Sequence, residues 1–127
     1  MKISCVMKRI AVVDDEPDIT TLLKRGLEYH GFAVDVFNDP QAALTSFAPG
    51  SYNLMIIDIR MPKINGFDLY RELRKKDGSV RVCFLTAFEI YYEEFRKIFP
   101  IIDVRAFIRK PVSIASLVSQ VNATIES

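Results

Sequence analysis

Short apolar runs alternate with longer stretches of helical periodicity along the whole chain. Five short, mostly apolar runs have the length of strands, and several are rich in β-branched residues. These runs cover residues 10–13, 32–37, 54–57, 80–85 and 104–108. After each run, apolar residues recur at spacings of three and four, as on one face of a helix. The predicted helices cover residues 17–30, 40–47, 67–76, 89–99 and 114–125. Asp15 is a candidate cap for the first of these helices, and Asn38-Asp39 is interpreted as the cap of the second.

Five strands that alternate with five helices predict a parallel sheet with right-handed crossovers and helices on both faces. The run Leu54–Ile57 is apolar at every position, as expected of a strand that is covered on both sides. A closed barrel of this kind needs eight such units, so an open, doubly wound α/β sheet is expected instead. We expect a single domain over residues 1–127, with its core at residues 8–126 and residues 1–7 as a loose extension.

Composition narrows the class of protein. The 17 Lys and Arg residues nearly balance the 16 Asp and Glu residues, and a net charge of +1 argues against coating nucleic acid or an anionic membrane. Apolar runs such as Ile10–Val13 are four residues long, whereas a membrane span needs about 20. Cys5 and Cys83 form no metal-binding or disulfide pattern. We therefore expect a cytoplasmic protein with no membrane segment.

Polar residues collect where the predicted strands end. In an open parallel sheet, the ligand site lies beyond the carboxyl ends of the strands. Asp14 and Asp15 follow the first strand, and Asp58 follows the third. Thr86 directly follows the fourth run, and Lys110 lies just after the fifth. Three carboxylates, one hydroxyl and one ammonium group are thus expected at the same edge of the sheet.

Three carboxylates in one crevice require compensation. Each close pair repels by about 4 kcal/mol at an effective dielectric constant near 20, so either one acid keeps its proton or a cation is bound. Oxygen ligands without His or Cys favour Mg²⁺, which retains waters that phosphate oxygens can replace. A metal ion, a lysine and a hydroxyl around an aspartate are suited to binding and transferring phosphoryl groups.

Four short motifs at these positions are similar to those of a known family. They are Val12–Pro17, Ile56–Pro62 followed by Asn65-Gly66, Leu85–Ala87, and Lys110-Pro111. In this order and at the ends of these strands, they resemble the receiver domain of two-component response regulators, over residues 8–126. The resemblance implies a flavodoxin-like (βα)₅ fold with strand order 2-1-3-4-5.

The resemblance also implies roles for the acidic residues. Asp58 would be the phosphoacceptor, which a partner sensor histidine kinase or phosphotransfer protein would phosphorylate. Asp15 and Asp58 would bind Mg²⁺ directly, together with the backbone carbonyl of Arg60. Asp14 would support the metal, mainly through water. Such a domain acts as a signalling switch and not as a turnover enzyme.

The remaining implied roles concern the response to phosphorylation. Thr86 and Lys110 would bind phosphoryl oxygens and move inward, and Phe107 would be the aromatic residue that fills the space they leave. The surface that changes would consist of the helix over 89–99, the fifth strand and the last helix. It would bind a downstream protein or a second copy of the chain, without direct contact to nucleic acid.

Other functions fit the residues less well. An aspartyl phosphohydrolase usually has a second aspartate two residues after the nucleophile, where this chain has Arg60. A nucleotide-binding fold would need a glycine-rich loop after the first strand, which is absent from the sequence. A receiver-like scaffold that binds partners without phosphorylation stays open as an alternative, because the segment 99–105 is bulkier than the family pattern.

Overall fold

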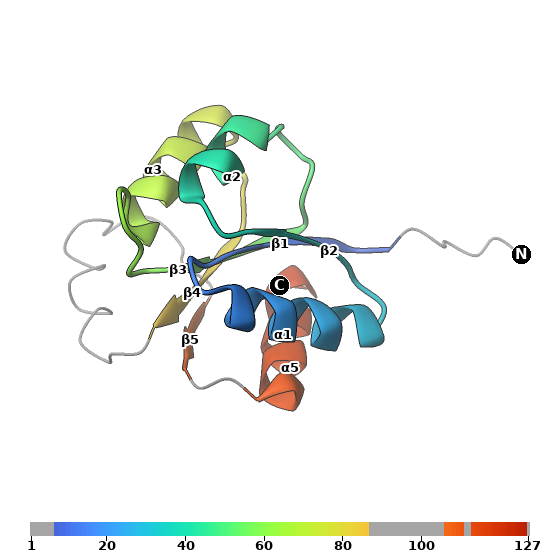
Figure 1. Cartoon of the computed structure of the whole chain (residues 1–127). Coiled ribbons are helices and arrows are strands. Elements are labelled where there is room, and N and C mark those ends of the chain that lie inside the picture. The colour runs from blue at the N-terminus through green and yellow to red at the C-terminus, as the bar shows by residue number, and fades with distance from the viewer. Residues whose placement is uncertain (1–6, 87–105, 111–112, 127) are drawn as a thin grey trace, which may run out of the picture.

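The computed structural model describes residues 7–86, 106–110 and 113–126. Their strands form one parallel sheet with helices on both faces (Figure 1). This confirms the predicted α/β class. The strands are β1 (Arg9–Val13), β2 (Ala33–Phe37), β3 (Leu54–Asp58), β4 (Val82–Thr86) and β5 (Ala106–Arg109). The helices are α1 (Pro17–Tyr29), α2 (Pro40–Ser46), α3 (Gly66–Lys76) and α5 (Ile114–Glu126).

The strand order is β2-β1-β3-β4-β5, which is the order that the resemblance implied. The chain reverses direction across the sheet after β2, because β3 pairs with the other side of β1. Val13 of β1 lies opposite Ile57 of β3, so the two strands end side by side. The predicted helix over 89–99 lies outside the described residues.

Alternate residues of each central strand supply the two halves of the core. Ala11 and Val13 of β1 face α2 and α3, where Leu69 and Leu73 belong to the same buried cluster. Ile10 and Val12 of β1 face the opposite way. Their cluster contains buried residues of α1 and α5, namely Leu23, Leu27, Leu117 and Val121. Figure 1 shows these two helix pairs on opposite sides of the sheet.

Some element ends differ from the prediction. β4 starts at Val82 and not at residue 80, because the amide of Val80 donates to the carbonyl of Asp77 in a turn. β2 starts at Ala33, because the amide of Phe32 is used to close α1 on the carbonyl of Leu27. These shifts leave the sheet edge that carries the acidic residues unchanged. No helix in the described part of the chain is long and apolar enough to cross a membrane.

Candidate functional site

Two of the predicted acidic residues lie next to each other at the carboxyl edge of the sheet. Asp14 follows β1 directly, and its amide donates to the carbonyl of Phe37 on β2. Asp58 is the last residue of β3, the strand on the other side of β1. Asp14 is 0% exposed and Asp58 is 5% exposed. Two carboxyl groups are therefore buried side by side, as the ends of neighbouring parallel strands require.

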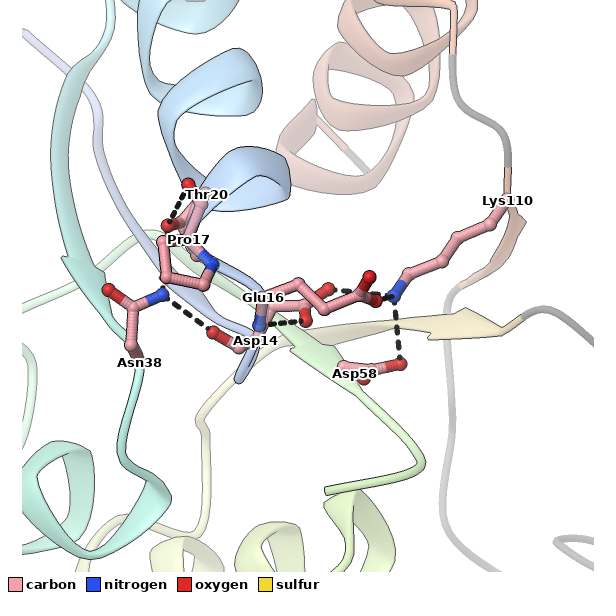
Figure 2. Close-up of polar contacts among 7 residues, drawn as sticks. All are labelled: Asp14, Glu16, Pro17, Thr20, Asn38, Asp58 and Lys110. Carbon is pink, nitrogen blue, oxygen red and sulfur yellow. Dashed lines mark hydrogen bonds and ion pairs between the residues drawn. The ribbon is translucent and has the colours of Figure 1, made fainter. Parts of the chain in front are cut away.

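Lys110 extends from the end of β5 to this pair (Figure 2). Its Nζ atom lies 2.9 Å from Oδ2 of Asp14 and 3.5 Å from Oδ1 of Asp58. A third acid, Glu16, places Oε1 3.0 Å from the same Nζ. The predicted lysine is thus directed into the acidic cluster, and its one ammonium group forms ion pairs with three carboxylates.

The site changes the proton affinity of its members. Burial, and then the charge of Asp14, raise the pKa of Asp58 to about 7. Burial also raises the pKa of Asp14, against the opposing effect of Lys110 and of the Glu16 amide. Burial acts to lower the pKa of Lys110, but the adjacent acids raise it above its usual value. The cluster therefore has too little positive charge to ionise fully near neutral pH.

The acidic side chains fit a divalent cation. One carboxylate oxygen from each of Asp14, Asp15, Glu16 and Asp58 lies within 4.8 Å of the others. Oδ2 of Asp14 is buried, and it shares its ammonium neighbour, Nζ of Lys110 at 2.9 Å, with Glu16 and Asp58. Hard oxygen ligands around a deficit of positive charge are typical of sites for Mg²⁺ or similar cations.

The backbone of the β1–α1 loop is fixed by a residue that the sequence did not single out. Asn38, just after β2, donates from Nδ2 to the carbonyl of Asp14 at 2.9 Å and lies 3.0 Å from Oγ1 of Thr20 (Figure 2). Thr20 in turn donates to the carbonyl of Pro17. The sequence did contain a signal for this role of Asn38, because Asn38 directly follows β2 and β2 ends at the same sheet edge as β1. The sequence pattern instead indicates a helix cap at Asn38-Asp39, and of these two residues Asp39 caps α2.

The start of α1 also differs from the sequence-based expectation. The N-cap residue is Glu16, and not Asp15. The amide of Glu16 donates to Oδ1 of Asp14 at 3.0 Å, so the buried acid holds the first turn in place. Asp15 is half-buried and keeps its carboxylate in the acidic cluster.

The loop after β3 is held close to Asp58. The amide of Gly66 donates to the carbonyl of Ile59 at 2.8 Å, and Asn65 caps α3 by accepting from the amide of Asp68. A Cβ atom on Gly66 would collide with the backbone oxygen of Asp58. Glycine therefore lets α3 begin directly beside the acid. Arg60 lies in this loop, two residues after Asp58.

Two predicted site residues are described through their backbone only. Thr86 ends β4 opposite Arg109, one position beyond the pair formed by Asp58 and Leu85. Phe107 lies in β5 opposite Phe84. The side chains of Thr86 and Phe107 lie outside the described part of the structure.

Comparisons with known proteins agree on one family. The family model for the response regulator receiver domain matches residues 10–122. Transcriptional regulatory protein TrcR of Mycobacterium tuberculosis is 30% identical over 117 residues, which are 92% of this chain and 45% of TrcR. The regulatory protein YkoG of Bacillus subtilis is also 30% identical, over 91% of this chain and 50% of YkoG. The chain thus spans about half the length of these relatives.

Solved structures give the same result. Response regulator TrrA of Thermotoga maritima, in complex with Mg²⁺ and BeF, superposes with a TM-score of 0.80 at 34% identity, over 93% of this chain and 99% of that one. The HemR receiver domain of Leptospira biflexa has a TM-score of 0.83 at 28% identity, over 94% and 95% of the two chains. The chain therefore belongs to the response regulator receiver domain family, the phosphoacceptor modules of two-component systems.

Proposed function

We propose that Asp58 is the phosphoacceptor and that Mg²⁺ is required for its phosphorylation by a sensor histidine kinase or a phosphotransfer protein. The observation that carries the proposal is the position of the Asp58 carboxyl group. It lies at the end of a central strand, buried beside Asp14 and within 3.5 Å of Nζ of Lys110. A related structure, TrrA, was solved with Mg²⁺ and BeF.

The acidic cluster is the proposed metal site. Asp15 and Asp58 would bind the ion directly with the backbone carbonyl of Arg60, and Asp14 would contribute mainly through water. A bound Mg²⁺ would offset the repulsion among these acids and polarise the oxygens of an incoming phosphoryl group. The burial of Asp14 and the sharing of one ammonium group among three carboxylates support this assignment.

Phosphoryl transfer requires an ionised Asp58. One carboxylate oxygen of Asp58 attacks phosphorus, an O–P bond forms, and the P–N bond of the donor phosphohistidine breaks with its electron pair returning to the imidazole ring. Nζ of Lys110 donates to a phosphoryl oxygen and stabilises the added charge. We assign the hydroxyl of Thr86 to a second phosphoryl oxygen, by the match of its motif to the family.

The change that phosphorylation would cause at the surface of the domain is part of the same proposal. Phosphorylation would draw Thr86 and Lys110 inward, Phe107 would fill the space they leave, and the surface of 89–99, β5 and α5 would change. That surface would bind a downstream protein or a second copy of the chain. We also propose that residues 1–127 act as one receiver domain, without direct nucleic-acid contact, because their net charge is only +1.

Treatment with acetyl phosphate and Mg²⁺, followed by intact-mass measurement, tests the proposal. We expect one phosphoryl adduct, which EDTA and Asp58→Asn abolish. Asp68→Asn is the matched control, because Asp68 is a half-buried aspartate on α3 that pairs with Arg71. Partner binding that is unchanged in Asp58→Asn, with no adduct in the wild type, would favour the scaffold alternative. Continuous release of phosphate from small esters would indicate a hydrolase.

A further inference from the structure

Lys110 is shared unequally among its acidic neighbours. Its Nζ atom lies 2.9 Å from Asp14 and 3.0 Å from Glu16, but 3.5 Å from Asp58. An ammonium group has three protons to donate. The two closest contacts both lie on the β1–α1 side of the site, so the lysine is held toward that side and away from Asp58.

Glu16 is the exposed member of this arrangement. Its side chain is 60% exposed, whereas that of Asp14 is fully buried and that of Lys110 is 14% exposed. Its backbone is anchored, because its amide donates to Oδ1 of Asp14 and its carbonyl, at the N-cap position of α1, accepts from the amide of Thr20. The carboxylate of Glu16 therefore extends from a fixed point over the edge of the site to reach Lys110 (Figure 2).

We propose that Glu16 is a positioning residue that competes with the phosphoryl group for Lys110. The inference rests on the function proposed above, in which Lys110 donates to a phosphoryl oxygen on Asp58. Movement of Nζ toward Asp58 lengthens its contact with Glu16, since Glu16 reaches the ammonium group from the start of α1 and Asp58 from the end of β3. Part of the free energy gained at the phosphoryl group is then offset by the lost ion pair, so Glu16 weakens the active state.

Two alternative roles for Glu16 predict different effects on the binding of Mg²⁺ and of an anion. As a metal ligand, which its place in the acidic cluster would allow, Glu16 would strengthen Mg²⁺ binding. As a general source of negative charge, it would repel an anion no more than any other nearby acid does. Asp18 is the matched control for this second role, because it is an exposed acid in the first turn of α1 and no ion pair joins it to Lys110 in the described structure.

The test measures two affinities in the wild type, Glu16→Gln and Asp18→Asn. The first is the Kd of Mg²⁺ alone. The second is the apparent affinity for beryllium fluoride, a tetrahedral phosphoryl analogue, at saturating Mg²⁺. We expect Glu16→Gln to bind the analogue roughly two- to fivefold more tightly, the range expected for an exposed ion pair. Asp18→Asn should bind it as the wild type does, and all three proteins should bind Mg²⁺ alike.

The salt dependence of analogue binding distinguishes an ion pair between Glu16 and Lys110 from a purely structural role of Glu16. The ratio of the Glu16→Gln and wild-type affinities should approach one when NaCl is raised from about 0.05 M to about 1 M, because an exposed ion pair is screened. Equal or weaker analogue binding by Glu16→Gln, an equal gain in Asp18→Asn, or a roughly tenfold loss of Mg²⁺ affinity in Glu16→Gln would each overturn the inference. A wild type that binds no beryllium fluoride would instead refute the proposed function itself.

Discussion

Nζ of Lys110 and Oδ2 of Asp14 lie 2.9 Å apart, although β3 and β4 separate the strands that carry them. The lysine follows the edge strand β5 and reaches across the carboxyl edge of the sheet to the loop after β1. Asp58 ends β3, one of the strands between β1 and β5, and its Oδ1 lies 3.5 Å from the same Nζ. A change in the charge of Asp58 therefore alters the electrostatic potential at both Asp14 and Lys110.

The raised pKa of Asp58 predicts a pH-dependent cost in stability when no metal is present. Burial raises this pKa from 3.8 to about 7, so the folded protein holds the proton more tightly than the unfolded chain does. The free energy of unfolding should then fall as pH rises from about 4 to about 7, and level off above that. Asp58→Asn should be more stable than the wild type at pH 8, by on the order of 1–4 kcal/mol.

Urea unfolding in EDTA at several pH values between 4 and 8 measures this difference. The advantage of Asp58→Asn should be smallest at pH 4, grow until about pH 7 and stay constant above that. A difference that stays constant with pH would show that the Asp58 carboxyl group titrates alike in the folded and unfolded protein.

Binding of Mg²⁺ should offset most of the stability that the folded protein loses when Asp58 is ionised. An ion that binds only the folded protein adds about 2.7 kcal/mol to its stability at 100 times the Kd. We expect Mg²⁺ to raise the melting temperature of the wild type at pH 8, and to raise that of Asp58→Asn much less. Differential scanning calorimetry with and without MgCl₂ measures this, with Asp18→Asn as a control that should respond like the wild type. Equal gains in all three proteins would argue against a metal site at Asp58.

Asn38 should matter for metal binding as well as for stability. Asn38→Ala removes the hydrogen bond to the carbonyl of Asp14, which should cost about 1–2 kcal/mol of stability. Because the loop that carries Asp14 and Asp15 is then less firmly held, Mg²⁺ affinity should fall by roughly tenfold. Calorimetric titration with MgCl₂ and urea unfolding check the two effects.

Asn53 supplies the control for Asn38. Its Oδ1 accepts from the amide of Arg9 at the opposite end of β1, at 2.7 Å. Asn53→Ala should therefore lower stability and leave Mg²⁺ affinity unchanged. If both variants weaken Mg²⁺ binding equally, Asn38 has no specific role in holding the site.

Gly66 should tolerate no side chain. A Cβ atom there would meet the carbonyl oxygen of Asp58, and a backbone atom cannot move aside as a flexible side chain can. We expect Gly66→Ala to lower the free energy of unfolding by about 1–3 kcal/mol and to displace the backbone amide NMR signals around Asp58. Gly78→Ala is the control, because a Cβ atom there meets nothing within 4 Å. Similar stability of the two variants would contradict the close approach of α3.

The sequence predicted those parts of the site that follow from strand ends. Asp14 and Asp58 had to meet because parallel strands β1 and β3 end at the same edge, and Lys110 follows a strand that ends there too. Such predictions need only the positions of the strands along the chain. The same kind of reasoning predicted helices on both faces of the sheet, because the run of consecutive apolar residues in β3 requires cover on both sides.

Side-chain reach and loop geometry were not predictable in this way. The pairing of Glu16 with Lys110 depends on the direction in which α1 starts, and the sequence favoured Asp15 as its cap. Asn38 is one of several polar residues at loop starts, and no pattern shows that its amide bonds to the backbone of Asp14. Both contacts arise between elements, where spacing along the chain carries little information.

Chemical mapping of the phosphorylated residue tests the central claim most directly. Borohydride converts an aspartyl phosphate to homoserine, which peptide mass spectrometry locates in the sequence. After incubation with acetyl phosphate and Mg²⁺, the account predicts homoserine at position 58 alone, and none when EDTA is present. Homoserine at another aspartate, or none at all under phosphorylating conditions, would contradict it.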